Sequence, residues 1–288
     1  MFNDQSIIET IQQRTSCRNY RDAPIAEALQ TRLRDFLAVT PPGPLGNTPR
    51  FELIAATIEE REALRGLGTY GFIKNPPGFV VGTLRDSREL EDFGYLMERI
   101  VLFATAHDLG TCWLGGTFTK SRFAARIAAT PEERIPAILS IGASAERRTL
   151  RDTLLRRLAG SDHRKPWAEL FFDGSFDRPL EREAAGDFAL LLDMVRLGPS
   201  ASNKQPWRIA RAEGGWHFYV QRTRGYIGSD RSAIPLADLQ RVDIGIAMCH
   251  WDLTAQEQGM AGTWDVNPPY LTPPDDLTEY RASWRPRA

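Results

Sequence analysis

An internal repeat is the feature that most constrains how this chain can fold. Residues 33–56, LRDFLAVTPPGPLGNTPRFELIAA, have the pattern of a helix, a proline-rich loop, an Asn, a Pro and a strand, and residues 191–212, LLDMVRLGPSASNKQPWRIARA, follow the same order. Residues 99–113, RIVLFATAHDLGTCW, are matched by residues 245–264, GIAMCHWDLTAQEQGMAGTW. The copies lie about 150 to 158 positions apart, which predicts two copies of one α+β unit in a single chain. Such units usually pair about a two-fold axis.

Hydrophobic periodicity indicates where the elements of each unit lie. Residues 89–109 form the strongest predicted helix, and because its apolar positions run nearly all round, we expect it to be central and buried. Residues 110–118, GTCWLGGTF, are predicted to form a glycine-rich turn after it. Further helices are predicted over 7–14, 26–39 and 188–197, and strands over 50–57, 76–84 and 135–144.

The composition excludes several classes of protein. With 36 basic and 37 acidic residues the net charge is −1, so the bulk charge favours neither a nucleic-acid nor a membrane partner. Cys17, Cys112 and Cys249 lie far apart without metal or redox spacing, which argues for a reducing compartment. The N-terminus lacks the apolar core of a signal peptide, and no apolar run approaches the roughly 18 residues of a membrane span. We therefore expect a soluble cytoplasmic protein.

The loop in the second copy, RLGPSASNKQPWRI, residues 196–209, has two readings. Gly-Pro followed by Ser and Asn is typical of a turn in which short polar side chains bond nearby backbone. The same side chains could instead surround a polyhydroxylated ligand. The loop alone does not decide between a turn and a binding site.

Several motifs in the right order resemble the FMN-dependent nitroreductase family. RTSCRNY (14–20) is similar to its Arg-x-Ser-x-Arg/Lys motif, and GPSASNKQPW (198–207) to its Pro-Ser-x-x-Asn-x-Gln-Pro-Trp loop. DLGTCWLGGTF (108–118) resembles its Gly-rich flavin segment, while IPAILSIGAS (135–144) and HRKPWAELFF (163–172) resemble its closing strand and basic tail. The resemblance implies a nitroreductase-like α+β fold with mixed or antiparallel sheets and helices.

The motifs are shared between the two copies in an unusual way. In the family, each FMN lies between two subunits and takes one motif from each. Here the first copy keeps the arginine motif but has TPPGPLGNTP as its loop, whereas the second copy keeps the loop but has lost the arginine motif. The resemblance therefore implies a fused pseudo-dimer, with residues 1–175 as one half and 176–288 as the other. We expect one FMN per chain and a monomer.

The chemistry of FMN explains the residue types in these motifs. Its phosphate favours guanidinium and ammonium groups, for which Arg14, Arg164 and Lys165 are the candidates. Arg18 would lie toward the pyrimidine edge, where a cation stabilises charge that develops on reduction. The other candidates, which would supply short polar arms, a cap or a close backbone approach to the ring, are Ser16, Leu114, Gly115, Gly116, Pro199, Ser200, Ser202, Asn203 and Gln205.

The resemblance implies an oxidoreductase in which NADH or NADPH reduces the flavin and a small acceptor, such as a nitroaromatic or a quinone, reoxidises it by ping-pong chemistry. The flavin carries the chemistry, so no catalytic side chain and no metal are expected. Two alternatives remain open. One is a flavin-binding or sensing protein without turnover, and the other is a different flavin reaction, such as enone reduction, dehalogenation or consumption of the flavin itself.

Overall fold

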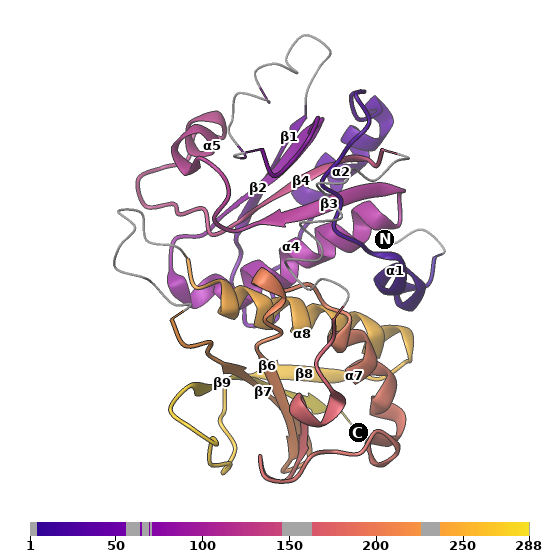
Figure 1. Ribbon diagram of the computed structural model, residues 1–288, viewed down its shortest axis with the longest axis vertical. Helices are drawn as coiled ribbons and strands as arrows, with labels where there is room; N and C mark the ends of the chain where they lie inside the picture. The colour runs from indigo at the N-terminus through magenta and orange to yellow at the C-terminus, as the bar shows by residue number, and fades with distance from the viewer. Residues whose placement is uncertain are drawn as a thin grey trace.

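Two β-sheets with the same strand order form the framework of the computed structural model, which describes residues 5–55, 64, 69, 71–145, 163–225 and 237–287 (Figure 1). The first sheet is antiparallel, in the order β1-β2-β4-β3. The second has the order β5-β6-β7-β9-β8. If β6 to β9 are read as the counterparts of β1 to β4, the two orders coincide. The predicted duplication of an α+β unit is thus confirmed.

The strand bounds follow the predicted pattern closely. In the first sheet the strands are β1 (Arg50–Ala55), β2 (Gly78–Thr83), β3 (Leu109–Leu114) and β4 (Ile138–Ala143). In the second they are β5 (Phe171–Asp173), β6 (Trp207–Ala212), β7 (Gly215–Gln221), β8 (Gly262–Asp265) and β9 (Thr278–Pro286). Residues 110–114 were predicted as part of a turn and residue 109 as the end of the preceding helix, which is wrong. They form β3 because Thr111 and Cys112 pair with Ile141 and Ser140 of β4.

Strand β5 has no counterpart in the first sheet. It pairs with β6 in parallel, with Phe171 opposite Ile209, whereas the other strand pairs of this sheet are antiparallel. The predicted division after residue 175 therefore leaves in the first half a strand that belongs to the second sheet. The chain crosses to the second sheet through residues 163–170, and these residues carry the predicted basic tail.

Helices separate and flank the two sheets (Figure 1). The long helices α4 (Leu90–Thr105) and α8 (Leu239–Glu257) lie next to each other between the sheets. Both are buried along most of their length, as predicted for the helix over 89–109. The other helices are α1 (Ile7–Gln13), α2 (Glu27–Ala38), α5 (Lys120–Arg126) and α7 (Ala189–Arg196), and the short 3-10 turns are η1 (Ser87–Glu89), η2 (Trp167–Glu169), η3 (Glu183–Phe188) and η4 (Ala201–Asn203).

Two glycines allow α4 and α8 to approach each other closely. A Cβ added at Gly94 would overlap the carbonyl oxygen of Val242, and one added at Gly245 would overlap the carbonyl oxygen of Glu91. Gly94 and Gly245 are separated along the chain by the same number of residues as Glu91 and Val242. Gly94 and Gly245 are therefore equivalent positions in the two copies, and so are Glu91 and Val242, the residues that they contact. Each glycine lies against the partner helix at the same relative place. This reciprocity is what an approximate two-fold axis through the helix pair requires.

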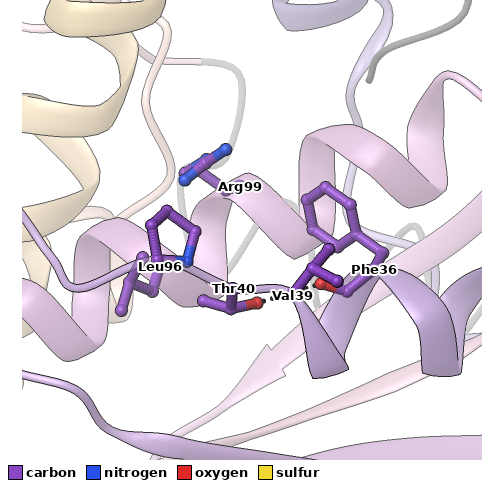
Figure 2. Close-up of a pocket in the computed structure, with 6 residues that line it drawn as sticks. Phe36, Val39, Thr40, Leu96 and Arg99 are labelled. Atoms are coloured by element: carbon purple, nitrogen blue, oxygen red, sulfur yellow. Dashed lines mark hydrogen bonds between the residues drawn. The ribbon is translucent and has the colours of Figure 1, made fainter.

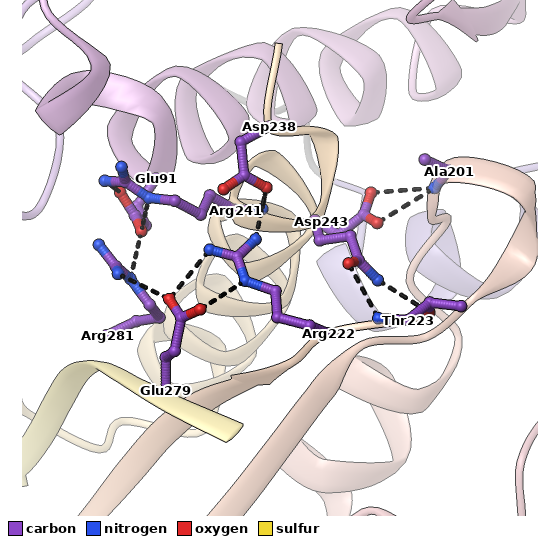
Figure 3. Close-up of polar contacts among 10 residues, drawn as sticks. Glu91, Ala201, Arg222, Thr223, Asp238, Arg241, Asp243, Glu279 and Arg281 are labelled. Carbon is purple, nitrogen blue, oxygen red and sulfur yellow. Dashed lines mark hydrogen bonds and ion pairs between the residues drawn. The ribbon is translucent and has the colours of Figure 1, made fainter. Parts of the chain in front are cut away.

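Buried ion pairs add to the contact between the halves. Glu91 at the start of α4 is almost fully buried and accepts bonds from Arg241 on α8, at 2.6 and 2.8 Å, and from Arg281 on β9, at 2.7 Å (Figure 3). Arg222 at the end of β7 pairs with Asp238 and Glu279 in the same group.

At the other end of α8, Glu257 accepts from the Ser6 hydroxyl and the Ile7 amide at the start of α1.

The glycine contact generates a stability prediction. Gly94→Ala or Gly245→Ala should lower the free energy of unfolding by about 2 kcal/mol or more, because the added methyl group overlaps backbone that cannot move without separating the helices. Chemical denaturation measures the change. Arg32→Ala on the exposed face of α2 is the control and should stay within about 0.5 kcal/mol of the wild type. If either glycine variant matches this control, the close crossing is wrong.

Candidate functional site

The arginine motif and the glycine-rich segment lie side by side. After α1 ends at Gln13, the chain runs next to β3, where Ser16 forms a parallel bridge with Thr111 and the Cys17 amide donates to the Thr111 carbonyl at 2.7 Å. Ser16 and Cys17 therefore lie beside β3 at Gly110 and Thr111. The predicted group 14–18 thus lies next to the strand that leads into the predicted group 114–116.

The predicted loop at 199–205 has an unusual backbone. Ser202, Asn203 and Gln205 have φ values of 50, 52 and 47°, in the left-handed region that residues other than glycine rarely adopt. Each such residue costs of order 1 kcal/mol and persists only where its surroundings impose the conformation. Here the Gln205 amide donates to the Ser200 hydroxyl at 2.9 Å, and the Ala201 amide donates to both Asp243 carboxylate oxygens, at 3.0 and 3.2 Å (Figure 3).

The basic tail packs directly against this loop. Arg164 donates to the Asn203 side-chain oxygen at 2.9 Å and to the Leu197 carbonyl at 3.1 Å. The Asn203 side chain donates in turn to the His163 carbonyl at 2.9 Å, and the Lys165 amide donates to the Gln205 side-chain oxygen at 2.9 Å. The third and fourth predicted groups, 164–165 and 199–205, thus form one hydrogen-bonded unit.

Gln205 has a different place from the one that the sequence suggested. Only 3% of its surface is exposed. Its side chain bonds the Lys165 amide and the carbonyls of His163 and Asn203. Because these contacts occupy both ends of the side-chain amide, Gln205 shapes the loop and does not extend toward a ligand. Pro199 and Ser200 are half-buried and Ser202 is exposed at the surface of the same loop.

The first turns of α8 contact both the glycine segment and the polar loop. A Cβ at Gly115 would overlap the Leu239 side chain, so the glycine segment lies against the beginning of this helix. Asp243, one turn further on, holds Ala201 of the loop. The glycine segment and the loop with the basic tail therefore meet at the beginning of α8, whereas the arginine motif lies beside β3 at Thr111. The resulting site has residues from both halves of the chain.

Positive charge accumulates beneath the loop. Arg208 is 5% exposed and bonds the carbonyls of Gln205 and Trp207 and the side chain of Gln221. Burial lowers the pKa of Arg208 to about 10. Burial and the nearby charge of Arg208 also lower the pKa of Lys165. Since Arg208 bonds only neutral oxygens in the part of the chain that the structure describes, this region is suited to an anionic ligand.

Arg208 was missed in the sequence because arginine is common in this chain, so a single one carries little information. A usable signal was its place directly after Gln-Pro-Trp, on a strand that its apolar neighbours mark as buried. A buried strand that contains an arginine requires oxygen acceptors nearby. The carbonyls of Gln205 and Trp207 meet this need.

The equivalent loop of the first half is held in the same way but carries different side chains. Asp92 on α4 occupies the place of Asp243 on α8 and accepts from the amides of Leu45, at 2.9 Å, and Asn47, at 2.8 Å. Burial raises the pKa of both aspartates. In this loop the left-handed residue before the Asn is Gly46, with φ of 91°, where the second half has Ser202. The aspartate that holds the loop occurs in both copies. The first copy has Gly46 in place of Ser202, so it lacks both the Ser202 hydroxyl and the backbone strain at this position.

A narrow pocket marks the place in the first half that the basic tail occupies in the second (Figure 2). In the repeat, Val39 and Pro41 correspond to Leu197 and Pro199. Arg164 bonds the Leu197 carbonyl, whereas Val39 is 68% exposed. The pocket accommodates little more than one water molecule, which is too small for a cofactor. Its lining residues are Phe36, Val39, Thr40, Pro41, Leu96 and Arg99.

Metal-binding clusters, membrane-spanning helices and cysteines bear on the kind of site. Within the described ranges, no group of three or more His, Cys, Asp or Glu side chains is placed to hold a metal ion. None of the helices that the structure describes is both long and apolar enough to cross a membrane. Cys17, Cys112 and Cys249 are buried and form no disulfide with one another.

Comparison with known proteins identifies the class. A family model described as "Putative TM nitroreductase" matches residues 6–255, so the chain belongs to this nitroreductase family. The structure of a "putative nitroreductase" from Thermotoga maritima MSB8 is similar over 97% of this chain and 92% of that chain, with 19% identity and a TM-score of 0.60. The shared fold thus extends over both halves. No curated protein matches the sequence.

Other solved structures are similar to about half of the chain. An FMN-dependent nitroreductase from Clostridium difficile R20291 has 20% identity over 49% of this chain and 90% of that chain, with a TM-score of 0.41. A "putative nitroreductase" in complex with FMN from Desulfovibrio desulfuricans has 22% identity over 53% of this chain and 97% of that chain, with a TM-score of 0.39.

The two equivalent loops generate a prediction about backbone strain. Ser202→Gly and Ser202→Ala both remove the hydroxyl group, but only glycine relieves the left-handed conformation, so the Gly variant should be more stable by about 1 kcal/mol. At the equivalent position Gly46→Ala should lower the stability by a similar amount, since no neighbouring atom lies within 4 Å of the added methyl group and the effect is one of backbone alone. Urea denaturation measures all three variants. Equal stability of the two Ser202 variants would contradict the strained loop.

Proposed function

We propose that the protein is an FMN-dependent oxidoreductase with one flavin site per chain. The observation that carries the proposal is that the start of α8 contacts both the glycine segment, at Gly115, and the loop of residues 199–205, which is hydrogen bonded to the basic tail through Arg164. Membership of a nitroreductase family supports it. A bound flavin would supply hydride transfer from NADH or NADPH to a small acceptor such as a nitroaromatic or a quinone.

The anionic end of the flavin fits the charge of the loop region. Arg14, Arg164 and Lys165 would bind the phosphate, with the buried charge of Arg208 behind them. Asn203 would act mainly through Arg164, whose guanidinium it holds at 2.9 Å. The lowered pKa of Lys165 is consistent with a site that awaits an anion, because a phosphate next to the ammonium group would raise this pKa again.

The remaining residues would hold the ribityl chain and the ring. Ser200 and Ser202 offer hydroxyl groups at the surface of the loop. Residues 114–116 would present backbone amides to the ring, and the space at Gly115 that Leu239 occupies shows why a side chain does not fit there. Ser16 lies between the two arginines of its motif, and Arg18 would face the pyrimidine edge.

The assembly follows from the same arrangement. We infer that residues 1–175 and 176–288 derive from two subunits of an ancestral dimer, with the tail at 163–173 reaching across. The contact of α4 with α8 supplies within one chain the interface that separate subunits would need, which favours a monomer. Three buried cysteines that form no disulfide with one another support a reducing compartment such as the cytoplasm.

Flavin content tests the single site. The purified protein should hold close to one FMN per polypeptide, measured from its absorbance after release, and a ratio near two would contradict the proposal.

Arg14→Ala and Asn203→Ala should each raise the dissociation constant of FMN about tenfold, because each removes a charge-assisted contact directly or through Arg164. Asn47→Ala in the equivalent loop, which also loses a side-chain hydrogen bond, should leave it unchanged.

Reduction by nicotinamide cofactors tests the activity. Under anaerobic conditions NADH or NADPH should bleach the flavin absorbance near about 450 nm, and a nitroaromatic or quinone should restore it. Double-reciprocal plots should give parallel lines, as ping-pong kinetics require. Bleaching by neither nucleotide would instead favour a flavin-binding protein without turnover. Bleaching without recovery by these acceptors would favour another flavin reaction.

A further inference from the structure

A buried carboxylate links three elements at the centre of the molecule. The Glu98 side chain on α4 accepts from the Trp113 indole of β3 at 2.9 Å through one oxygen. Its other oxygen lies 3.0 Å from the Nε2 atom of His250 on α8, and both side chains of this pair are fully buried. The His250 Nδ1 atom lies 2.8 Å from the Met194 carbonyl of α7. Glu98 and Trp113 belong to the first half, and His250 and Met194 to the second.

The contacts determine where the protons lie. A carbonyl oxygen can only accept, so the Nδ1 atom of His250 carries a hydrogen. The 3.0 Å contact between Nε2 and the Glu98 oxygen then holds one further proton. Whether this proton lies on the nitrogen or on the oxygen, the pair is neutral as a whole. Every polar atom of the two side chains is therefore satisfied without water.

The ends of this network lie next to both parts of the candidate site. Trp113 directly precedes Leu114 and Gly115, whose backbone would face the flavin ring. Met194 belongs to the last turn of α7, which ends at Arg196, just before the loop of residues 199–205. Glu98 thus connects the ring side of the site in one half to the ribityl and phosphate side in the other.

The network is present on only one side of the approximate two-fold axis. The axis relates Glu98 to Cys249 and His250 to Arg99, so the same pair is not formed at the equivalent place. There Asp252 of α8 accepts from the Tyr95 hydroxyl of α4 at 2.6 Å and from the Trp264 indole at 3.3 Å. Both networks hold the halves together, but only that of Glu98 reaches α7 and the loop with the polar arms. Joining the helices alone does not explain this asymmetry.

We propose that Glu98 is a positioning residue of the flavin site, which keeps the segment after Trp113 in register with the loop after α7 by hydrogen bonding Trp113 and His250 together. The inference rests on the proposed function. It assigns to Glu98 the alignment of two half-sites that come from different parts of the chain. Its role depends on two hydrogen bonds in fixed directions.

Glutamine can make the same two bonds. Its side-chain oxygen can accept from the Trp113 indole, and its side-chain amide can donate to Nε2 of a neutral His250 that keeps its hydrogen on Nδ1. Alanine makes neither bond. Glu98→Gln should therefore preserve the dissociation constant of FMN within about twofold, whereas Glu98→Ala should raise it about tenfold or more.

Asp252 provides a matched control on the opposite side of the axis. Asp252→Ala removes a carboxylate that accepts one bond across the halves, from Tyr95, and one within its own half, from Trp264, and it should lower the melting temperature as Glu98→Ala does. It should nevertheless leave FMN affinity, the flavin visible spectrum and the midpoint potential unchanged. Glu98→Ala and the milder Trp113→Phe, which removes only the indole donor, should shift the spectrum and the potential.

The experiment measures FMN affinity, the midpoint potential and the melting temperature of the full-length variants. If Glu98→Ala and Asp252→Ala weaken FMN binding equally, or if Glu98→Gln is as impaired as Glu98→Ala, the inference is overturned. If Glu98→Ala does not fold, Trp113→Phe decides, and an unchanged potential and affinity in that variant overturn it. Failure of the wild type to bind FMN is a different result, which removes the proposed function first.

Discussion

The close crossing of α4 and α8 determines the geometry of the rest of the molecule. Gly94 and Gly245 bring backbone against backbone, so the two helices have little freedom to slide or rotate past each other. The start of α8 contacts the glycine segment through Leu239 and the polar loop through Asp243. A shift at the crossing would therefore separate the two parts of the candidate site. The buried pairs of Glu91 and of Glu98 with the opposite half act on the same interface.

Covalent fusion explains how the two copies could diverge. In a dimer of identical subunits every substitution appears in both sites, so each subunit needs both motifs. In a fused chain each copy can lose one motif while a single site remains complete. The framework residues behave accordingly, since strand order, the crossing glycines and the loop anchors Asp92 and Asp243 occur in both copies.

Much of the framework could be predicted because it follows from local patterns. The apolar periodicity of residues 89–109 indicated α4, and the repeat implied a second helix and a second sheet. β3 was missed because a strand with Gly110, Thr111 and two bulky apolar residues has no clear alternation, and its pairing with β4 decides its conformation. The four groups of candidate residues were found through motifs, and the structure brings the glycine segment and the loop with its basic tail to the start of α8.

The contacts between distant residues could not be predicted from the sequence. Gln205 was expected to face a ligand, but the chain at 163–165 returns to this loop and takes up its hydrogen bonds. The pairing of Glu98 with His250 depends on the crossing of two helices that are far apart along the chain. No periodicity encodes such a pairing, because each residue taken alone is a polar group within an apolar helix.

Departures from the usual rules of stability coincide at one place in the molecule. Left-handed residues other than glycine, a buried arginine bonded to neutral oxygens and a fully buried carboxylate–imidazole pair are each unfavourable in isolation. All three occur around the loop of the second half or on the path that leads to it, although left-handed residues other than glycine also occur elsewhere, at Asn75, Asp108, Ala128 and Glu213. In the first half Gly46 relieves the equivalent loop, and the axis relates Glu98 and His250 to residues that do not form the pair. Since both loops belong to one fold, folding alone does not require the strain at Ser202, and the binding role proposed for the second loop would account for it.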